Sequence, residues 1–179
     1  RAAPRPRHGR RRARARRRAQ RAALAAARAP GARARARRAA CPLAPEALEP
    51  LLALPDARFV ALELGECSAA VAALRAKTGA RIDAWPGVAA DPDEAAALAC
   101  ALDAVVCVPT AMAHLAGALG RPVWVLVPGV ATWRYLWQGE RMPWYGSMRV
   151  LRRAPDADVR SIVEQARDAL TRSAAPRPD

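Results

Sequence analysis

A threonine at the start of a predicted helix is the residue of this sequence best suited to binding chemistry. Ala104–Val108 is a continuous apolar run, typical of a strand buried on both faces. Residues 110–119 follow as a predicted helix that ends at Gly120. The free N–H groups and the dipole of such a helix start attract anions, which suits a diphosphate. Thr110 would cap the helix and donate its hydroxyl to a phosphate oxygen, beside the small Ala111; a plain cap without a ligand is the open alternative.

A histidine one turn further on could complete this site. His114 lies four residues after Thr110 and therefore on the same face of the predicted helix. A neutral imidazole there can donate or accept one hydrogen bond, so it suits a phosphate or a sugar. A structural role in a helix rich in alanine and leucine is equally open.

A second candidate region is rich in aromatic residues. Residues 133–145 contain five aromatic side chains and two arginines, bounded by proline and glycine. Aromatic faces beside a guanidinium, as at Trp133 and Arg134, suit a base or sugar ring that carries a phosphate. The alternative is a hydrophobic lid over the edge of a sheet.

Other kinds of site find little support. No Gly-x-Gly-x-x-Gly follows a predicted strand and no Gly-x-Ser-x-Gly occurs, which disfavours a dehydrogenase or a hydrolase. The four cysteines form no Cys-x-x-Cys pair, and only two histidines are present, so we expect no metal site. The cysteines in apolar runs, Cys100 and Cys107, are interpreted as small buried hydrophobic residues. Reduced thiols and a cytoplasmic location follow.

The elements that would position these residues alternate between strand and helix. The patterns predict an α/β fold, a Rossmann-like parallel sheet with helices on both faces, over residues 41–172. The clearest helix start is Asp91-Pro92, a cap followed by proline and two acidic residues. The predicted strands are 58–64, 80–85, 104–108, 122–127 and 148–151, and the predicted helices are 45–54, 67–77, 91–102, 110–119 and a last one from Asp156 or Asp158 to about 170.

The first 40 residues differ sharply from the rest. They contain 16 arginines and no acidic residue, whereas the remainder has 14 basic and 16 acidic side chains. Like charges at this density predict disorder for 1–40, and we expect a disordered tail at 173–179. A strand and loop of degraded sequence, or a polybasic arm for nucleic acid or a membrane surface, are the alternatives. Aromatic residues for base stacking are absent from this segment, so we expect no specific nucleic-acid partner.

The sequence was also searched for a signal peptide, a membrane span and an initiator methionine. The N-terminal region has positive charge but no apolar core of a signal peptide. The apolar stretch 95–120 is interrupted by Asp103, Pro109 and His114, so it is not a membrane span. The sequence does not begin with methionine, and we expect it to be a fragment.

Two sequence elements together resemble a known enzyme family. They are Thr110-Ala-Met-Ala-His-Leu-Ala116, within residues 105–126, and Pro143-Trp-Tyr-Gly-Ser-Met-Arg149, with Trp133-Arg134 between them. Over roughly 41–170 the chain is similar to heptosyltransferase-like glycosyltransferases of family nine, especially those attached to tetratricopeptide repeats. One departure from that pattern is Pro109, where the family has an aspartate.

The resemblance implies the C-terminal, donor-binding lobe of a two-lobed GT-B glycosyltransferase that needs no metal and no cofactor beyond its nucleotide-sugar substrate. The donor would lie at Thr110, Ala111, His114, Trp133 and Arg134. The expected activity is glycosyl transfer from a nucleotide sugar to a saccharide, lipid-linked or protein acceptor. The acceptor lobe would lie in a missing part, and any peripheral membrane association would arise through that part or the acceptor. The alternative is a degenerate, non-catalytic lobe that serves as a nucleotide-binding or protein-interaction module.

Overall fold

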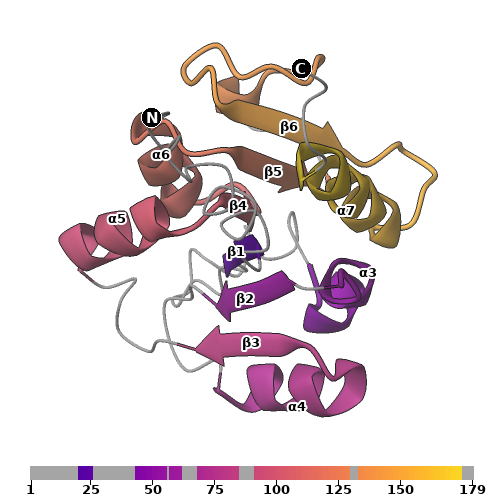
Figure 1. The fold of residues 1–179 in the computed structure, drawn as a ribbon. Coiled ribbons are helices and arrows are strands. Elements are labelled where there is room, and N and C mark those ends of the chain that lie inside the picture. The colour runs from indigo at the N-terminus through magenta and orange to yellow at the C-terminus, as the bar shows by residue number, and fades with distance from the viewer. Residues whose placement is uncertain are drawn as a thin grey trace, which may run out of the picture.

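The computed structural model shows a Rossmann-like α/β fold (Figure 1). It describes residues 20–25, 43–55, 57–61, 68–84, 91–129 and 133–174. A six-stranded parallel sheet has the strand order β3-β2-β1-β4-β5-β6. The strands are β1 (Gln20–Ala25), β2 (Ala57–Ala61), β3 (Arg81–Ala84), β4 (Ala104–Cys107), β5 (Val123–Val127) and β6 (Met148–Arg152).

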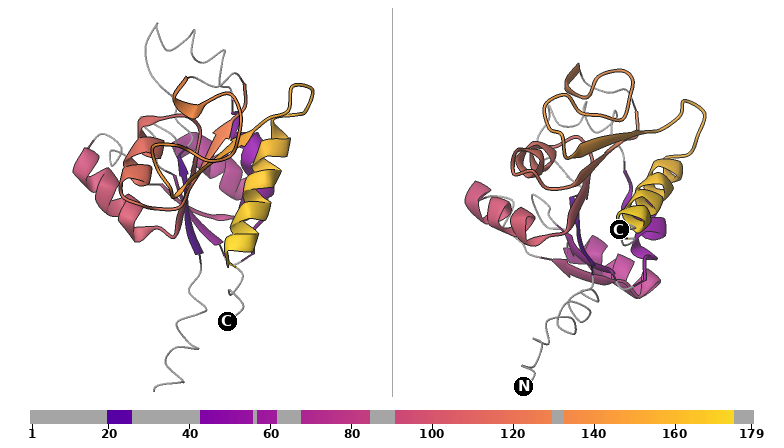
Figure 2. Two further views of the ribbon diagram at one scale, coloured as in Figure 1. Left: turned by 90° about the horizontal axis from the view of Figure 1, so that it is seen from above. Right: turned by 45° about the horizontal axis from the view of Figure 1, so that its top comes forward.

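Helices cover both faces of the sheet, as the alternating pattern predicts (Figure 2). One face carries α5 (Pro92–Ala101) and α6 (Ala111–Ala118). The other carries η1 (Pro45–Leu48), α3 (Glu49–Leu52), α4 (Ser68–Thr78) and α7 (Arg160–Ala174).

Alternate residues of β4 and β5 enter opposite hydrophobic cores. In β4, Val106 packs on the side of α3, α4 and α7, and Val105 packs on the side of α5 and α6. In β5, Leu126 and Val125 divide in the same way. Because each strand is buried on both faces, the runs that form β4 and β5 contain no polar residue.

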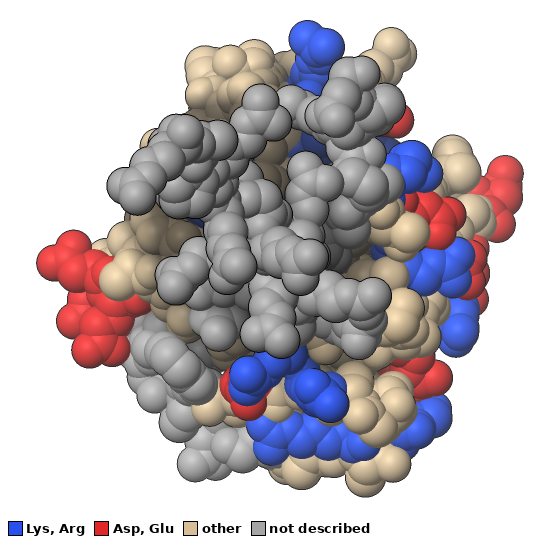
Figure 3. All heavy atoms as spheres, viewed as in Figure 1, with Lys and Arg blue, Asp and Glu red and all other residues tan. Residues whose placement is uncertain are grey.

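The start of α5 confirms the predicted cap. The Asp91 carboxylate accepts hydrogen bonds from the backbone N–H of Asp93 at 2.9 Å and of Glu94 at 3.3 Å. These bonds satisfy N–H groups that have no partner inside the helix, and the acidic side chains favour the positive end of the dipole. Figure 3 shows acidic side chains gathered on the left, where α5 begins.

The N-terminal segment differs from the prediction. Residues 20–25 form β1, which pairs with β2 on one side and β4 on the other, so the predicted disorder of 1–40 is wrong for these six residues. The folded lobe therefore begins before residue 41. For these six residues the strand alternative holds, because a central strand needs only about five or six residues with backbone hydrogen bonds on both sides, whatever the charge of the flanking sequence. The other residues of 1–40 lie outside the described part of the chain.

The C-terminal boundary and two helices also differ from the predictions. Helix α7 continues to Ala174, beyond the predicted end of the lobe, and begins at Arg160, whose N–H donates to the Asp158 carboxylate at 3.1 Å. The predicted helix 45–54 is a 3-10 turn followed by one α-helical turn. Of the predicted tail, residues 175–179 lie outside the described part. No helix among the described residues has the length and apolar character to cross a membrane.

Candidate functional site

The order of the strands determines where a ligand would bind in this sheet. The chain builds β1, β2 and β3 outward in one direction and then returns to β4, β5 and β6 in the other. In open α/β sheets, ligands bind beyond the carboxyl ends of the strands at this change of direction. Here that position lies at the ends of β1 and β4. Thr110 lies three residues after the end of β4, and α6 begins at the next residue.

Thr110 occupies the cap position but does not act as the predicted side-chain cap. Its backbone is extended, with φ −143° and ψ 170°, and its carbonyl accepts from the N–H of Ala113 at 3.1 Å. Its hydroxyl makes no capping bond, and its Oγ1 atom is buried without a hydrogen-bond partner among the described residues. A buried polar atom without a partner costs about 1–3 kcal/mol. The start of α6 therefore holds an unsatisfied hydroxyl beside the free N–H groups of the first turn.

The Thr110 side chain is a neighbour of the Cys107 thiol. Burial raises the pKa of Cys107 to about 12, and the neighbouring Thr110 side chain lowers it by less. The two side chains lie close enough for the hydroxyl to favour the thiolate, yet no hydrogen bond of standard geometry involves the Thr110 oxygen, which is buried. Because only a thiolate is a good nucleophile, Cys107 has a packing role, as predicted. Cys100 is exposed, so the same prediction is wrong for it, and Cys41 and Cys67 lie outside the described residues.

The raised pKa of Cys107 predicts a pH effect on stability. As pH rises above about 9, the unfolded chain loses this thiol proton while the folded chain keeps it, so the free energy of unfolding falls. Cys107→Ala should remove this contribution and make the fall shallower by about 0.7 kcal/mol per pH unit on average between pH 8 and 10, where the unfolded thiol is only partly ionised. Urea denaturation at several pH values from about 8 to 10 measures the slope. The matched variant Cys100→Ala should keep the original slope; equal slopes for wild type and Cys107→Ala would contradict the prediction.

His114 is held between two tyrosines. Its Nε2 atom lies 3.2 Å from the Tyr135 hydroxyl, and its ring centroid lies 5.7 Å from that of Tyr135 and 5.8 Å from that of Tyr145. Gly117, also on α6, leaves room for the Tyr145 ring, because a Cβ atom there would lie 2.8 Å from Tyr145 Cγ. In this structure His114 therefore links α6 to the aromatic segment.

Trp133 and Arg134 belong to the short helix η3 (Trp133–Tyr135). The Arg134 guanidinium carbon lies 4.6 Å from the centre of the Trp133 ring, a cation–π contact, and both side chains are exposed. Because Tyr135 contacts His114, the structure brings this part of the aromatic segment to α6. The lid alternative applies to Tyr135, which is buried, and not to Trp133.

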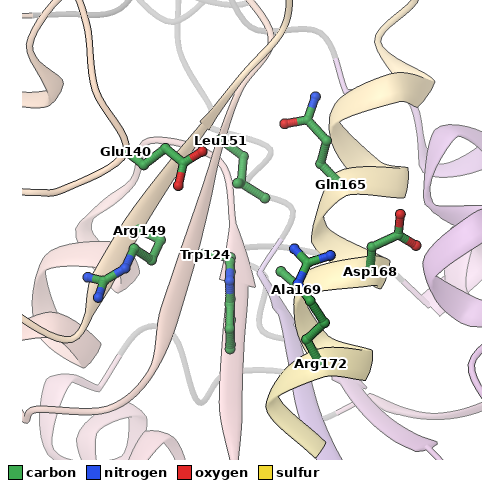
Figure 4. A pocket seen from close by; sticks show the side chains of 8 residues that line it. All are labelled: Trp124, Glu140, Arg149, Leu151, Gln165, Asp168, Ala169 and Arg172. Carbon is green, nitrogen blue, oxygen red and sulfur yellow. The ribbon is translucent and has the colours of Figure 1, made fainter.

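A separate pocket of about 370 Å³ lies between the edge of the sheet and α7 (Figure 4). Trp124 and Arg149 are each the second residue of their strand, so the pocket is displaced from the carboxyl ends and from Thr110. Its lining carries both signs of charge and includes no predicted site residue. The lining residues are Trp124, Glu140, Arg149, Leu151, Gln165, Asp168, Ala169 and Arg172.

Sequence reasoning missed the importance of Tyr135. It is one of five aromatic residues in a short segment, and no pattern singles it out. Only the fold places its hydroxyl against His114 and its backbone carbonyl within reach of the Arg152 guanidinium, which donates to it. In the described part of the chain, no three residues among His, Cys, Asp and Glu gather as a metal-binding group.

The fold and the site define a Rossmann-like α/β lobe with an exposed aromatic segment beside the start of α6. No family model matches the chain, and no solved structure matches it. The chain is 38% identical over 103 residues to the protein FlbA of Caulobacter vibrioides. The match covers 56% of this chain and 17% of FlbA, so the chain spans far less than two thirds of that relative.

Proposed function

We propose that this chain is the donor-binding lobe of a metal-independent, nucleotide-sugar-dependent glycosyltransferase of the heptosyltransferase-like kind. The observation that carries the proposal is the buried, unpaired Thr110 hydroxyl at the start of α6, where the strand order changes direction. A diphosphate supplies several acceptor oxygens and negative charge, which are what this hydroxyl and the free N–H groups lack. The similarity of residues 105–126 and 143–149 to that family supports the same assignment.

The proposed chemistry of this lobe is electrostatic. Negative charge builds up on the nucleotide diphosphate as the bond to the sugar breaks, and the positive end of the α6 dipole stabilises that charge without a metal. The N–H groups of Thr110 and Ala111 bind the diphosphate, and the Thr110 hydroxyl donates to it. Trp133 and Arg134 reach the base or the sugar. His114 contacts the donor or, through Tyr135, positions η3.

In this proposal, the acceptor site and the attached repeats belong to a larger protein of which this chain is one part. In this proposal, transfer to a saccharide, lipid-linked or protein acceptor uses parts outside this chain, which matches 17% of FlbA. Association with tetratricopeptide repeats, a cytoplasmic location and any peripheral membrane contact are part of the same proposal.

Calorimetric titration of the full chain with UDP, GDP and ADP tests the donor site. At least one nucleotide should bind, and Thr110→Val should weaken that binding about ten- to a hundredfold, because a hydrogen bond to a charged group is lost. Thr110→Ser keeps the hydroxyl and should retain most of the affinity. Urea denaturation of each variant separates lost binding from lost folding.

Two results would count against the donor site. One is the absence of binding to all three nucleotides, and the other is equal binding by wild type and Thr110→Val.

A non-catalytic lobe is the second candidate, and Pro109 favours it. Proline has neither a carboxylate nor an N–H group at the position where the family has aspartate. A degenerate lobe would bind nucleotide or a protein without transferring sugar. Nucleotide binding that is unaccompanied by hydrolysis of any UDP-, GDP- or ADP-sugar, in wild type and in Pro109→Asp alike, would favour this candidate.

A further inference from the structure

The pocket between α7 and the edge of the sheet presents three polar side chains that differ in charge. Glu140 lies on the side of β6, and Gln165 and Arg172 lie on α7. Figure 4 shows the Glu140 carboxylate directed toward α7 and the Arg172 guanidinium directed toward Trp124. The pocket therefore has a negative group on one wall, and a positive group with an amide on the other.

The two other charged residues of the lining are already bound. Arg149 donates from one guanidinium nitrogen to two backbone carbonyls at 3.0 and 3.1 Å, and Figure 4 shows it directed away from α7. The Asp168 carboxylate accepts from Arg167 at 2.8 and 2.9 Å. Glu140 and Arg172, by contrast, form no ion pair with another described residue. Two opposite charges thus face the pocket without a partner.

The base of the pocket is apolar and fixed in place. Trp124 and Leu151 are only 9% and 8% exposed and belong to one hydrophobic core, against which Ala169 packs. On the side of β6, the N–H of Val150 donates to the Glu140 carbonyl at 2.7 Å, which holds the backbone that carries this carboxylate. A preformed pocket of about 370 Å³ loses little conformational entropy on binding and lies within the usual range for small ligands.

We propose that this pocket binds a short peptide with free termini, a dipeptide or tripeptide with an apolar side chain. The N-terminal ammonium pairs with Glu140, and the C-terminal carboxylate pairs with the planar guanidinium of Arg172. The Gln165 amide offers both a donor and an acceptor, which match the C=O and the N–H of a peptide bond. The apolar side chain of the peptide lies on Trp124 and Leu151.

Other small ligands would satisfy fewer of these groups. A phosphate or a nucleotide would be repelled by Glu140, and a polyamine would be repelled by Arg172. A neutral saccharide would leave both charges without a partner. A single amino acid carries both charges on one carbon atom and has no peptide bond for Gln165, whereas each further residue adds about 3.8 Å of reach. A peptide with two free termini is the class that engages both walls.

The proposal goes beyond the donor site and does not rest on it. The pocket is displaced from the carboxyl ends of the strands, whereas Thr110 follows the end of β4. Thr110→Val should therefore leave peptide binding unchanged while nucleotide binding weakens. Failure of either site is thus distinguishable from failure of the other.

Calorimetric titration of the full chain with leucine and three leucine dipeptides tests the pocket. The probes are leucyl-leucine, its N-acetylated form, its C-terminal amide and free leucine. Leucyl-leucine should bind with a dissociation constant below about 1 mM. Blocking either terminus should weaken binding about three- to tenfold, because one charge pair is lost, and leucine should bind at least about tenfold more weakly.

Two variants assign each terminus of the peptide to one wall. Glu140→Gln should weaken leucyl-leucine binding about three- to tenfold, and N-acetylation should then make no further difference. Arg172→Gln should weaken it by a similar factor, and C-terminal amidation should then make no further difference. Both side chains are exposed, so neither change opens a cavity, and urea denaturation of each variant should match the wild type. A general loss of structure would not produce this correspondence between variant and probe.

Arg160→Gln and Glu164→Gln are the matched controls. These two residues form an ion pair at 3.5 Å on the same helix, outside the lining of the pocket. Each control removes a charge of the same sign as one of the test variants, so the net charge changes equally. Both should bind all four probes as the wild type does.

Four outcomes would overturn the proposal. The first is no binding of leucyl-leucine up to about 5 mM. The second is equal binding of the free and the two blocked dipeptides, which would assign the pocket to an internal segment of a protein partner. The third is equal binding of leucine and leucyl-leucine, which would assign it to a single amino acid. The fourth is wild-type affinity for leucyl-leucine in both Glu140→Gln and Arg172→Gln, which would place the binding elsewhere.

Discussion

Ala23→Pro is expected to destabilise the lobe by at least about 3 kcal/mol, because proline cannot donate a backbone hydrogen bond within a central strand. Ala23 is paired with Val60 of β2 and with Val105 of β4, so β1 joins the two halves of the sheet. A domain of this size is stable by only about 5–15 kcal/mol, and much of that margin would be lost. Urea denaturation followed by circular dichroism measures the change in the free energy of unfolding.

Ala23→Gly provides the control for this substitution. Glycine keeps the backbone N–H and should cost about 1 kcal/mol through conformational entropy alone. Proline should therefore be clearly worse than glycine. If both variants unfold at the same urea concentration, the backbone of residue 23 does not pair as a central strand.

Tyr135→Ala is expected to cost about 3–5 kcal/mol, the range for removing a buried aromatic ring. The ring is 3% exposed and packs with His114, and it lies directly after Trp133 and Arg134. Its loss should also release the aromatic segment, because η3 would lose its contact with α6. Urea denaturation measures the stability, and the rate of proteolytic cleavage within 133–145 measures the release.

Tyr135→Phe isolates the hydroxyl from the ring. It removes the contact with His114 Nε2 and should cost about 1 kcal/mol while the segment resists cleavage nearly as in the wild type. Cleavage as fast in Tyr135→Phe as in Tyr135→Ala would show that the hydroxyl, and not the ring, holds the segment. An unchanged stability in Tyr135→Ala would contradict the burial of this side chain.

Most of the regular elements could be predicted because local patterns specify them. The apolar run at residues 104–108, the cap at Asp91 and the apolar run at 122–127 each require only a few neighbouring residues to interpret. Strand β1 escaped prediction for the opposite reason. Its backbone is paired by β2 and β4, which lie more than 30 residues away along the chain, and the surrounding arginines predict disorder.

Some features of the candidate site could likewise be predicted from the sequence, and others could not. Spacing alone placed Thr110, Ala111 and His114 at the start of one helix, and α6 does begin at Ala111. Spacing could not show that the Thr110 hydroxyl is buried without a partner, nor that His114 Nε2 lies 3.2 Å from Tyr135. It also did not separate the buried Tyr135 from the exposed Trp133 and Trp137, since all three belong to one aromatic segment.

What the sequence by itself determined is the alternation of strands and helices, because hydrophobic periodicity, caps and turn residues act over a few positions. Only the tertiary structure decided the order of the strands, the place of β1 between β2 and β4, and the contact that joins α6 to the aromatic segment. These features depend on contacts between residues far apart in the chain, and such contacts form only when the sheet and its helices pack together. The same packing leaves Trp133, Trp137 and Trp144 at the surface, which composition alone could not decide.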